Sequence, residues 1–187
     1  MDRTSMWYPA RGFTLVELMV VLVVLAATLT ASLPAMQRLL QNNQVRVQAS
    51  RVLGAINLAR SEAVMRNTPV SICPSSMAFT GEAVCSGVYS DGWIVYSNRD
   101  RDRVVDSGVD TVLRVFAGLP QGFTLTNRAG TRAAFELINY LPDGSSHSNR
   151  TLHLCSPLGA AVQSLSIVIN IVGRPRVAAD WGKCLPA

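Results

Sequence analysis

The amino-acid sequence predicts an α+β fold, in which one long N-terminal helix precedes a β-rich domain. Residues 13–66 contain first an unbroken apolar run and then apolar side chains at helical spacing. After Pro69 the pattern changes to short β-like segments separated by Gly, Pro, Asp and Ser. Without the apolar run, roughly 150 residues remain, which is the usual size of a single domain.

The first part of the helix is the apolar run at residues 13–36, FTLVELMVVLVVLAATLTASLPAM. Its length matches the roughly 20 residues that a helix needs to cross a bilayer. One acidic residue, Glu17, lies near its start, where a carboxylate inside the bilayer costs about 2.5–3.5 kcal/mol. Because a charge kept at that cost usually has a use, we expect Glu17 to be functional.

The second part of the helix, residues 37–67, is amphipathic. Apolar side chains recur at helical spacing at Ala49, Val52, Leu53, Ile56, Ala59 and Ala63. We expect this stripe to pack against a sheet. Asn67, Thr68 and Pro69 then end the helix.

The remaining residues, 68–187, are predicted to form the β-rich domain. Its strands are rich in β-branched and aromatic residues and are bounded by turn residues. The predicted strands are Val70–Cys73, Gly92–Tyr96, Val112–Phe116, Phe123–Thr126, Ala133–Leu141, Thr151–Cys155 and Leu165–Val172. None of these runs reaches the length of a membrane span.

Four cysteines follow the apolar run, at Cys73, Cys85, Cys155 and Cys184. The sequence has no Cys-x-x-Cys pair and only two histidines, which argues against a zinc site. An even number of cysteines in an exported domain favours disulfides, and free buried thiols are the alternative. Three pairings are possible. We prefer Cys73 with Cys85 and Cys155 with Cys184, because each pair closes a local loop.

The residues around the start of the apolar run resemble a processing signal. Residues 11–18 read RGFTLVEL, with Gly12 directly before Phe13, and this is similar to the class III signal of type IV pilins and type II secretion pseudopilins. The resemblance implies that a prepilin peptidase removes residues 1–12 as a leader, and that the new N-terminal Phe13 is methylated. It also implies that Glu17 pairs with the amine of a neighbouring subunit during assembly. The alternative is an ordinary signal anchor that tolerates one acid.

Later motifs extend the resemblance to the GspH/FimT-like minor pilins and pseudopilins. It rests on Asp91–Tyr96, on Val112–Val115 behind an acidic loop, and on Gly173–Arg174. The resemblance implies that the helix packs against two antiparallel sheets, that residues 13–36 form the transmembrane and assembly helix, and that other pilins or pseudopilins are the partners. It implies a single-pass protein of the bacterial inner membrane with a periplasmic domain, which assembles into a surface pilus or a periplasmic pseudopilus.

The segment Gly173–Arg176 reads GRPR and carries two arginines at a spacing of two. On an extended chain both side chains point to the same side, as a pair suited to phosphates. The segment resembles the Gly-Arg-x-Arg motif of FimT-type minor pilins, which implies that Arg174 and Arg176 bind DNA during natural transformation. Lys183 and Arg150 are candidates to extend this site. Alternatively, the arginines are solvated or pair with Asp180.

The overall charge permits binding to nucleic acid without requiring it. The chain has a net charge of +5, and removal of the leader lowers it by one unit.

No catalytic or metal site is predicted. Asp143, Ser145 and His147 lie together in a segment that is typical of a turn. In residues 98–110 arginines alternate with the acids, which argues against a calcium loop. We therefore expect no enzyme activity and no cofactor.

Three functions remain on the sequence alone. The first is a minor pilin in the tip or initiation complex of a type IV pilus. The second is a DNA-binding module on that same scaffold, and the third is an H-type pseudopilin of a type II secretion system.

Overall fold

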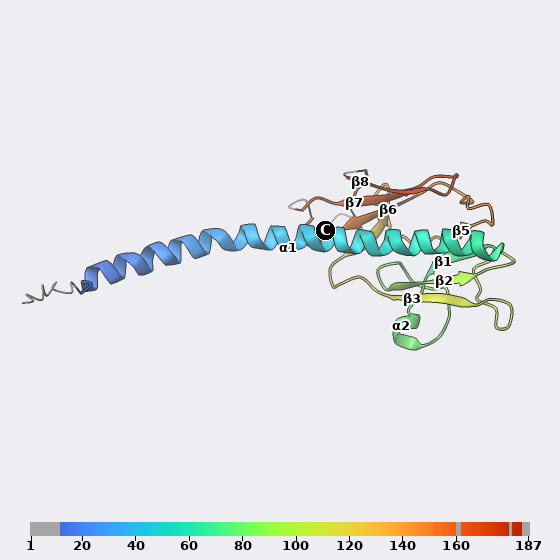
Figure 1. The fold of residues 1–187 in the computed structure, drawn as a ribbon, viewed down its shortest axis with the longest axis horizontal. Helices are drawn as coiled ribbons and strands as arrows, with labels where there is room; N and C mark the ends of the chain where they lie inside the picture. Colours follow the sequence, from blue (N-terminus) through green and yellow to red (C-terminus); the bar gives the residue numbers. More distant parts are fainter. Residues whose placement is uncertain (1–11, 160–161, 180, 185–187) are drawn as a thin grey trace, which may run out of the picture. The chain divides into compact units, whose positions relative to one another are not determined.

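The structure is a computed structural model that describes residues 12–159, 162–179 and 181–184 (Figure 1). Nearly all of the predicted leader, residues 1–11, lies outside the described residues, and so does Asp180. The chain divides into two compact units between Leu39 and Leu40, and each unit is described by itself.

The first unit contains the N-terminal part of helix α1, which runs from Leu15 to Arg66 and continues through Pro34. Its large apolar side chains, from Phe13 to Leu39, are all exposed. In the part of the chain that the structure describes, α1 is the one helix that is long and apolar enough to cross a membrane.

The second unit contains the rest of α1 and two four-stranded antiparallel sheets, which confirms the predicted α+β fold. The first sheet has the order β3-β2-β1-β5, with β1 at Val70–Pro74, β2 at Gly92–Ser97, β3 at Val112–Ala117 and β5 at Ile138–Tyr140. The second sheet has the order β4-β6-β7-β8, with β4 at Thr124–Asn127, β6 at Arg150–Cys155, β7 at Leu165–Ile169 and β8 at Pro175–Ala179. A short helix, α2, spans Met77–Thr80.

Two predicted strands are too long, and the other predicted strand boundaries differ from the observed ones by at most one residue. Of the predicted strand Ala133–Leu141, only Ile138–Tyr140 forms β5, while Ala133 makes an isolated bridge to Thr126. β7 ends at Ile169 because a turn follows, in which the Gly173 N–H donates to the Asn170 carbonyl at 2.8 Å. The chain then returns as β8, which alternation of apolar residues did not reveal as a strand.

The core joins the second half of α1 to both sheets (Figure 1). The predicted apolar stripe is buried at Ala49, Val52, Ile56, Ala59 and Ala63. A smaller cluster, Cys73, Ile94 and Tyr96, lies apart from this core, with Cys85 and Val105 packed on it. Apolar cover on both faces explains why β1 and β2 are buried at every residue.

Candidate functional site

The predicted processing site lies at the start of α1. Phe13 is exposed, and an added Cβ at Gly12 would meet nothing within 4 Å. The Thr14 hydroxyl accepts a hydrogen bond from the Glu17 N–H at 3.2 Å, so Thr14 caps the helix. The spacing Thr-x-x-Glu, which our sequence analysis missed, is that of a capping box. Glu17 therefore lies in the first turn, where the helix dipole favours a carboxylate.

The predicted DNA-binding residues lie on and beside the outer face of the second sheet. Leu152, Leu154, Ile167 and Ile169 face the core and are buried. Neighbouring residues along a strand point to opposite faces, so Thr151, Val168 and Arg176 share the other face, where the register pairs them in a row. Arg176 is exposed on β8, which is the edge strand.

The C-terminal segment, residues 181–184, is held on this outer face. The Lys183 N–H donates to the Arg128 carbonyl at 3.1 Å, and the Thr126 hydroxyl donates to the Lys183 carbonyl at 3.0 Å. A disulfide joins Cys155 of β6 to Cys184, and a second disulfide joins Cys73 to Cys85. These links fix the position of Trp181 relative to the sheet.

Trp181 contacts two arginines that are distant in sequence. The guanidinium carbon of Arg128 lies 4.5 Å from the centre of the Trp181 ring, and that of Arg176 lies 5.8 Å from it. These are cation–π distances. Our sequence analysis missed Arg128, because it follows β4 in a turn and carries no motif. We call Arg128, Arg176 and Trp181 the Trp181 cluster.

The other predicted residues take different positions. The Arg174 N–H donates to the Asn170 side chain at 2.9 Å, and the Arg174 side chain is exposed. Lys183 is exposed but lines a separate hollow with His153 and Ser164. The ion pairs among the described residues are Arg66–Glu62 and Arg132–Glu136, and neither involves Arg128, Arg174 or Arg176.

Gly173 of the GRPR segment has a structural role. Its φ is +79°, and an added Cβ would collide with the carbonyl oxygen of Gly144. The Tyr140 hydroxyl donates to the Gly173 carbonyl at 3.2 Å, and burial raises the pKa of Tyr140 to about 12. The glycine therefore lets the β7–β8 turn pack against the loop at residue 144, which positions the two arginines that follow.

The two alternative clusters weighed in the sequence are also brought together. Carboxylates of Asp100, Asp102 and Asp106 lie within 4.8 Å of one another, and partial burial together with neighbouring acids raises the pKa of Asp106. In the second cluster, hydrogen bonds from the Ser145 side chain and from its N–H, the latter at 2.8 Å, lower the pKa of Asp143. Such bonds are typical of a turn.

Comparison with known proteins gives two family matches. The sequence model described as "Type II transport protein GspH" matches residues 48–173, and that described as "Prokaryotic N-terminal methylation motif" matches residues 8–33. No curated protein sequence matches the chain.

Solved structures with a similar fold include the type IV minor pilin FimU of Pseudomonas aeruginosa strain PAO1. One crystal form is 17% identical with a TM-score of 0.54, covering 75% of this chain and 95% of FimU. A second form is 17% identical with a TM-score of 0.53, covering 73% and 98%. The minor pseudopilin EpsH from the type 2 secretion system of Vibrio cholerae is 13% identical with a TM-score of 0.46, covering 73% and 97%.

Proposed function

The chain belongs to the GspH family, and we propose that it is a minor pilin of a type IV pilus that binds DNA through its second sheet. In this proposal the peptidase cuts between Gly12 and Phe13, and Phe13 is methylated. Residues 13–36 then anchor the subunit in the inner membrane and in the fibre. Glu17 meets the amine of a neighbouring subunit there, where pairing offsets the cost of its charge.

The Trp181 cluster is the observation that supports DNA binding. Arg128 and Arg176 come from opposite edges of the second sheet, and the ring of Trp181 contacts both guanidinium groups. Arg174 adds a third exposed guanidinium at the start of β8. Several cations on one face suit the phosphates of a DNA backbone, with little dependence on base sequence.

A salt series on the full-length chain in nonionic detergent tests this proposal. We expect duplex DNA to bind more weakly as salt rises, and the double variant Arg174→Ala, Arg176→Ala to flatten the log–log slope by roughly two units. The double variant Arg99→Ala, Arg114→Ala is the matched control, since both of these exposed arginines lie away from the second sheet. An equal loss of affinity in both variants would show only a general charge effect.

The alternative is an H-type pseudopilin of a type II secretion system, which uses the same anchoring helix and fold. A deletion strain separates the two functions. Loss of surface pili with normal secretion of exoproteins supports the pilus. Loss of secretion with normal pili overturns it.

A further inference from the structure

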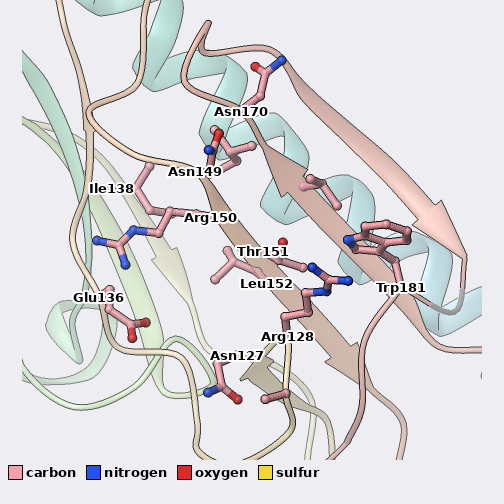
Figure 2. Close-up of a pocket in the computed structure, with 13 residues that line it drawn as sticks. Asn127, Arg128, Glu136, Ile138, Asn149, Arg150, Thr151, Leu152, Asn170 and Trp181 are labelled. Atoms are coloured by element: carbon pink, nitrogen blue, oxygen red, sulfur yellow. The ribbon is translucent and has the colours of Figure 1, made fainter.

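A pocket opens beside the Trp181 cluster where β4 ends (Figure 2). The last residue of β4, Asn127, pairs with Leu152, so β6 continues through Thr151 and Arg150 without a partner strand on that side. The pocket has a volume of about 520 Å³ and is lined by residues of both sheets, among them Ile138 of β5. This volume lies within the usual range for small-molecule sites.

Two arginines line this pocket. In Figure 2 the Arg128 side chain points toward Trp181, whereas the Arg150 side chain points away from it, toward the side where Ile138 and Glu136 lie. The Nε atom of Arg150 is buried and has no hydrogen-bond partner among the residues described. A buried donor that lacks an acceptor is unfavourable, so a ligand that brings an acceptor into the pocket would satisfy this donor.

The rest of the lining combines apolar and aromatic side chains with the polar Asn127, Asn149, Thr151 and Asn170. Leu152 and Ile169 are almost fully buried below it, and Trp181 forms a wall that is 43% exposed. Glu136 contributes one carboxylate, of which one oxygen accepts from Arg132 at 2.6 Å. The pocket thus combines guanidinium donors, a flat aromatic ring, an apolar floor and several polar side chains, among which Glu136 supplies a carboxylate.

We propose that this pocket binds one unpaired nucleotide of a DNA strand, with its phosphate on Arg150 and its base against Trp181 and the apolar floor. This inference rests on the proposed function, because the Trp181 cluster would hold the adjoining duplex. An acidic peptide would satisfy the arginines, but it would leave the aromatic wall and the apolar floor without a matching group. A nucleotide matches all of these groups, since its base stacks on an aromatic ring and donates to a carboxylate.

The test compares two duplexes of the same sequence, one blunt and one with a short single-stranded overhang, by binding to the full-length chain in detergent. Stacking of one base contributes about 1–3 kcal/mol, so we expect the overhang to bind roughly tenfold more tightly. Arg150→Gln should remove this preference while binding to the blunt duplex stays unchanged. Arg114→Gln, on the first sheet, is the control for loss of one charge and should keep the preference.

Each outcome separates this inference from the proposed function. Equal binding of both duplexes by the wild type, or a preference that survives Arg150→Gln, overturns the pocket and leaves duplex binding intact. If hexaglutamate and a thymidine oligonucleotide displace the overhang duplex equally well, the pocket recognises only negative charge, and the inference is also overturned. If Arg150→Gln does not fold, Arg150→Lys replaces it, because it keeps the positive charge but lacks the Nε donor; the preference should fall while binding to the blunt duplex stays unchanged.

If the wild type binds no DNA at all, the proposed function fails, and titration with a deoxynucleoside monophosphate decides on the pocket. Binding that Arg150→Gln weakens supports the pocket. The pocket is overturned if the nucleotide does not bind, or if inorganic phosphate alone binds equally well.

Discussion

The guanidinium carbon of Arg128 lies 4.5 Å from the centre of the Trp181 ring, although Arg128 follows β4 and Trp181 lies near the C-terminus. The contact depends on two hydrogen bonds, one from the Lys183 N–H to the Arg128 carbonyl and one from the Thr126 hydroxyl to the Lys183 carbonyl. It also depends on Gly130, whose φ is +66° and whose added Cβ would lie 2.6 Å from the Lys183 carbonyl. The predicted DNA-binding surface is therefore assembled by the C-terminal segment as well as by the GRPR segment.

Trp181→Ala should weaken duplex binding, because Arg128 and Arg176 lose the ring that both contact. Each exposed cation–π contact contributes about 0.5–1 kcal/mol, so the loss of two should raise the Kd roughly five- to thirtyfold. Trp181→Phe should retain most of the affinity. Phe79→Ala, at an exposed aromatic position on α2, should leave binding unchanged in fluorescence anisotropy.

Removing the Cys155–Cys184 disulfide should affect both stability and DNA binding. The paired variant Cys155→Ser, Cys184→Ser should lose about 2–4 kcal/mol of unfolding free energy and should release the segment that carries Trp181. The Cys73–Cys85 disulfide holds no part of this surface, so the paired variant Cys73→Ser, Cys85→Ser should reduce stability without affecting DNA binding. Denaturant unfolding measures the stability of both variants, and DNA titration measures their affinity. An equal loss of affinity in the two variants would contradict the prediction.

Gly173→Ala should destabilise the domain more than Gly81→Ala. Both glycines have similar positive φ values, +79° and +77°, so both variants pay the same backbone strain of about 1 kcal/mol. An added Cβ at Gly173 also collides with Gly144, whereas nothing lies within 4 Å at Gly81. Thermal unfolding should therefore show a clearly larger decrease in Tm for Gly173→Ala, and equal decreases would argue against the close packing of the β7–β8 turn.

Stability should fall at alkaline pH because buried tyrosines must ionise. Burial raises the pKa of Tyr140 to about 12, and the pKa of Tyr89 is raised further by burial and by Glu136. A raised pKa stabilises the fold fully below the ordinary value of about 10, and this stabilisation is lost as the pH rises through 12. Tyr140→Phe should therefore lose less stability between pH 10 and 12 than the wild type.

At neutral pH the same variant should be less stable by about 1 kcal/mol, because it lacks the hydrogen bond to the Gly173 carbonyl. Urea unfolding at pH 7 and at pH 11 measures both effects. Parallel changes in the two proteins would show that Tyr140 does not control the alkaline transition.

Glu17→Gln should block assembly without blocking processing, because only the charge that neutralises a neighbouring amine is removed. Thr14→Ala is the control, since it removes the helix cap at Glu17 but keeps the carboxylate. Mass spectrometry of the mature chain measures processing, and immunoblots of sheared fibres measure incorporation. Normal incorporation of Glu17→Gln would show that the carboxylate is dispensable.

Much of the fold could be predicted from the sequence because its signals are local. The apolar run and the amphipathic stripe required only helical spacing, and the start of each strand from β1 to β3 followed from β-branched and aromatic residues next to turn residues. The strand boundaries that failed depended on contacts between distant segments. Ala133 bridges to Thr126, and the turn after Ile169 is fixed where Gly173 meets Gly144.

The same division holds for the site. The sequence by itself identified the anchoring helix with Glu17, the four cysteines and the GRPR arginines, since each is a residue type in a recognisable short pattern. Only the tertiary structure decided which groups surround those arginines. Arg128 reaches Trp181 because β4 and the C-terminal segment lie together, and Arg150 lines the pocket because β4 ends before it. Such proximity comes from side-chain packing and strand pairing across the chain, which no local pattern encodes.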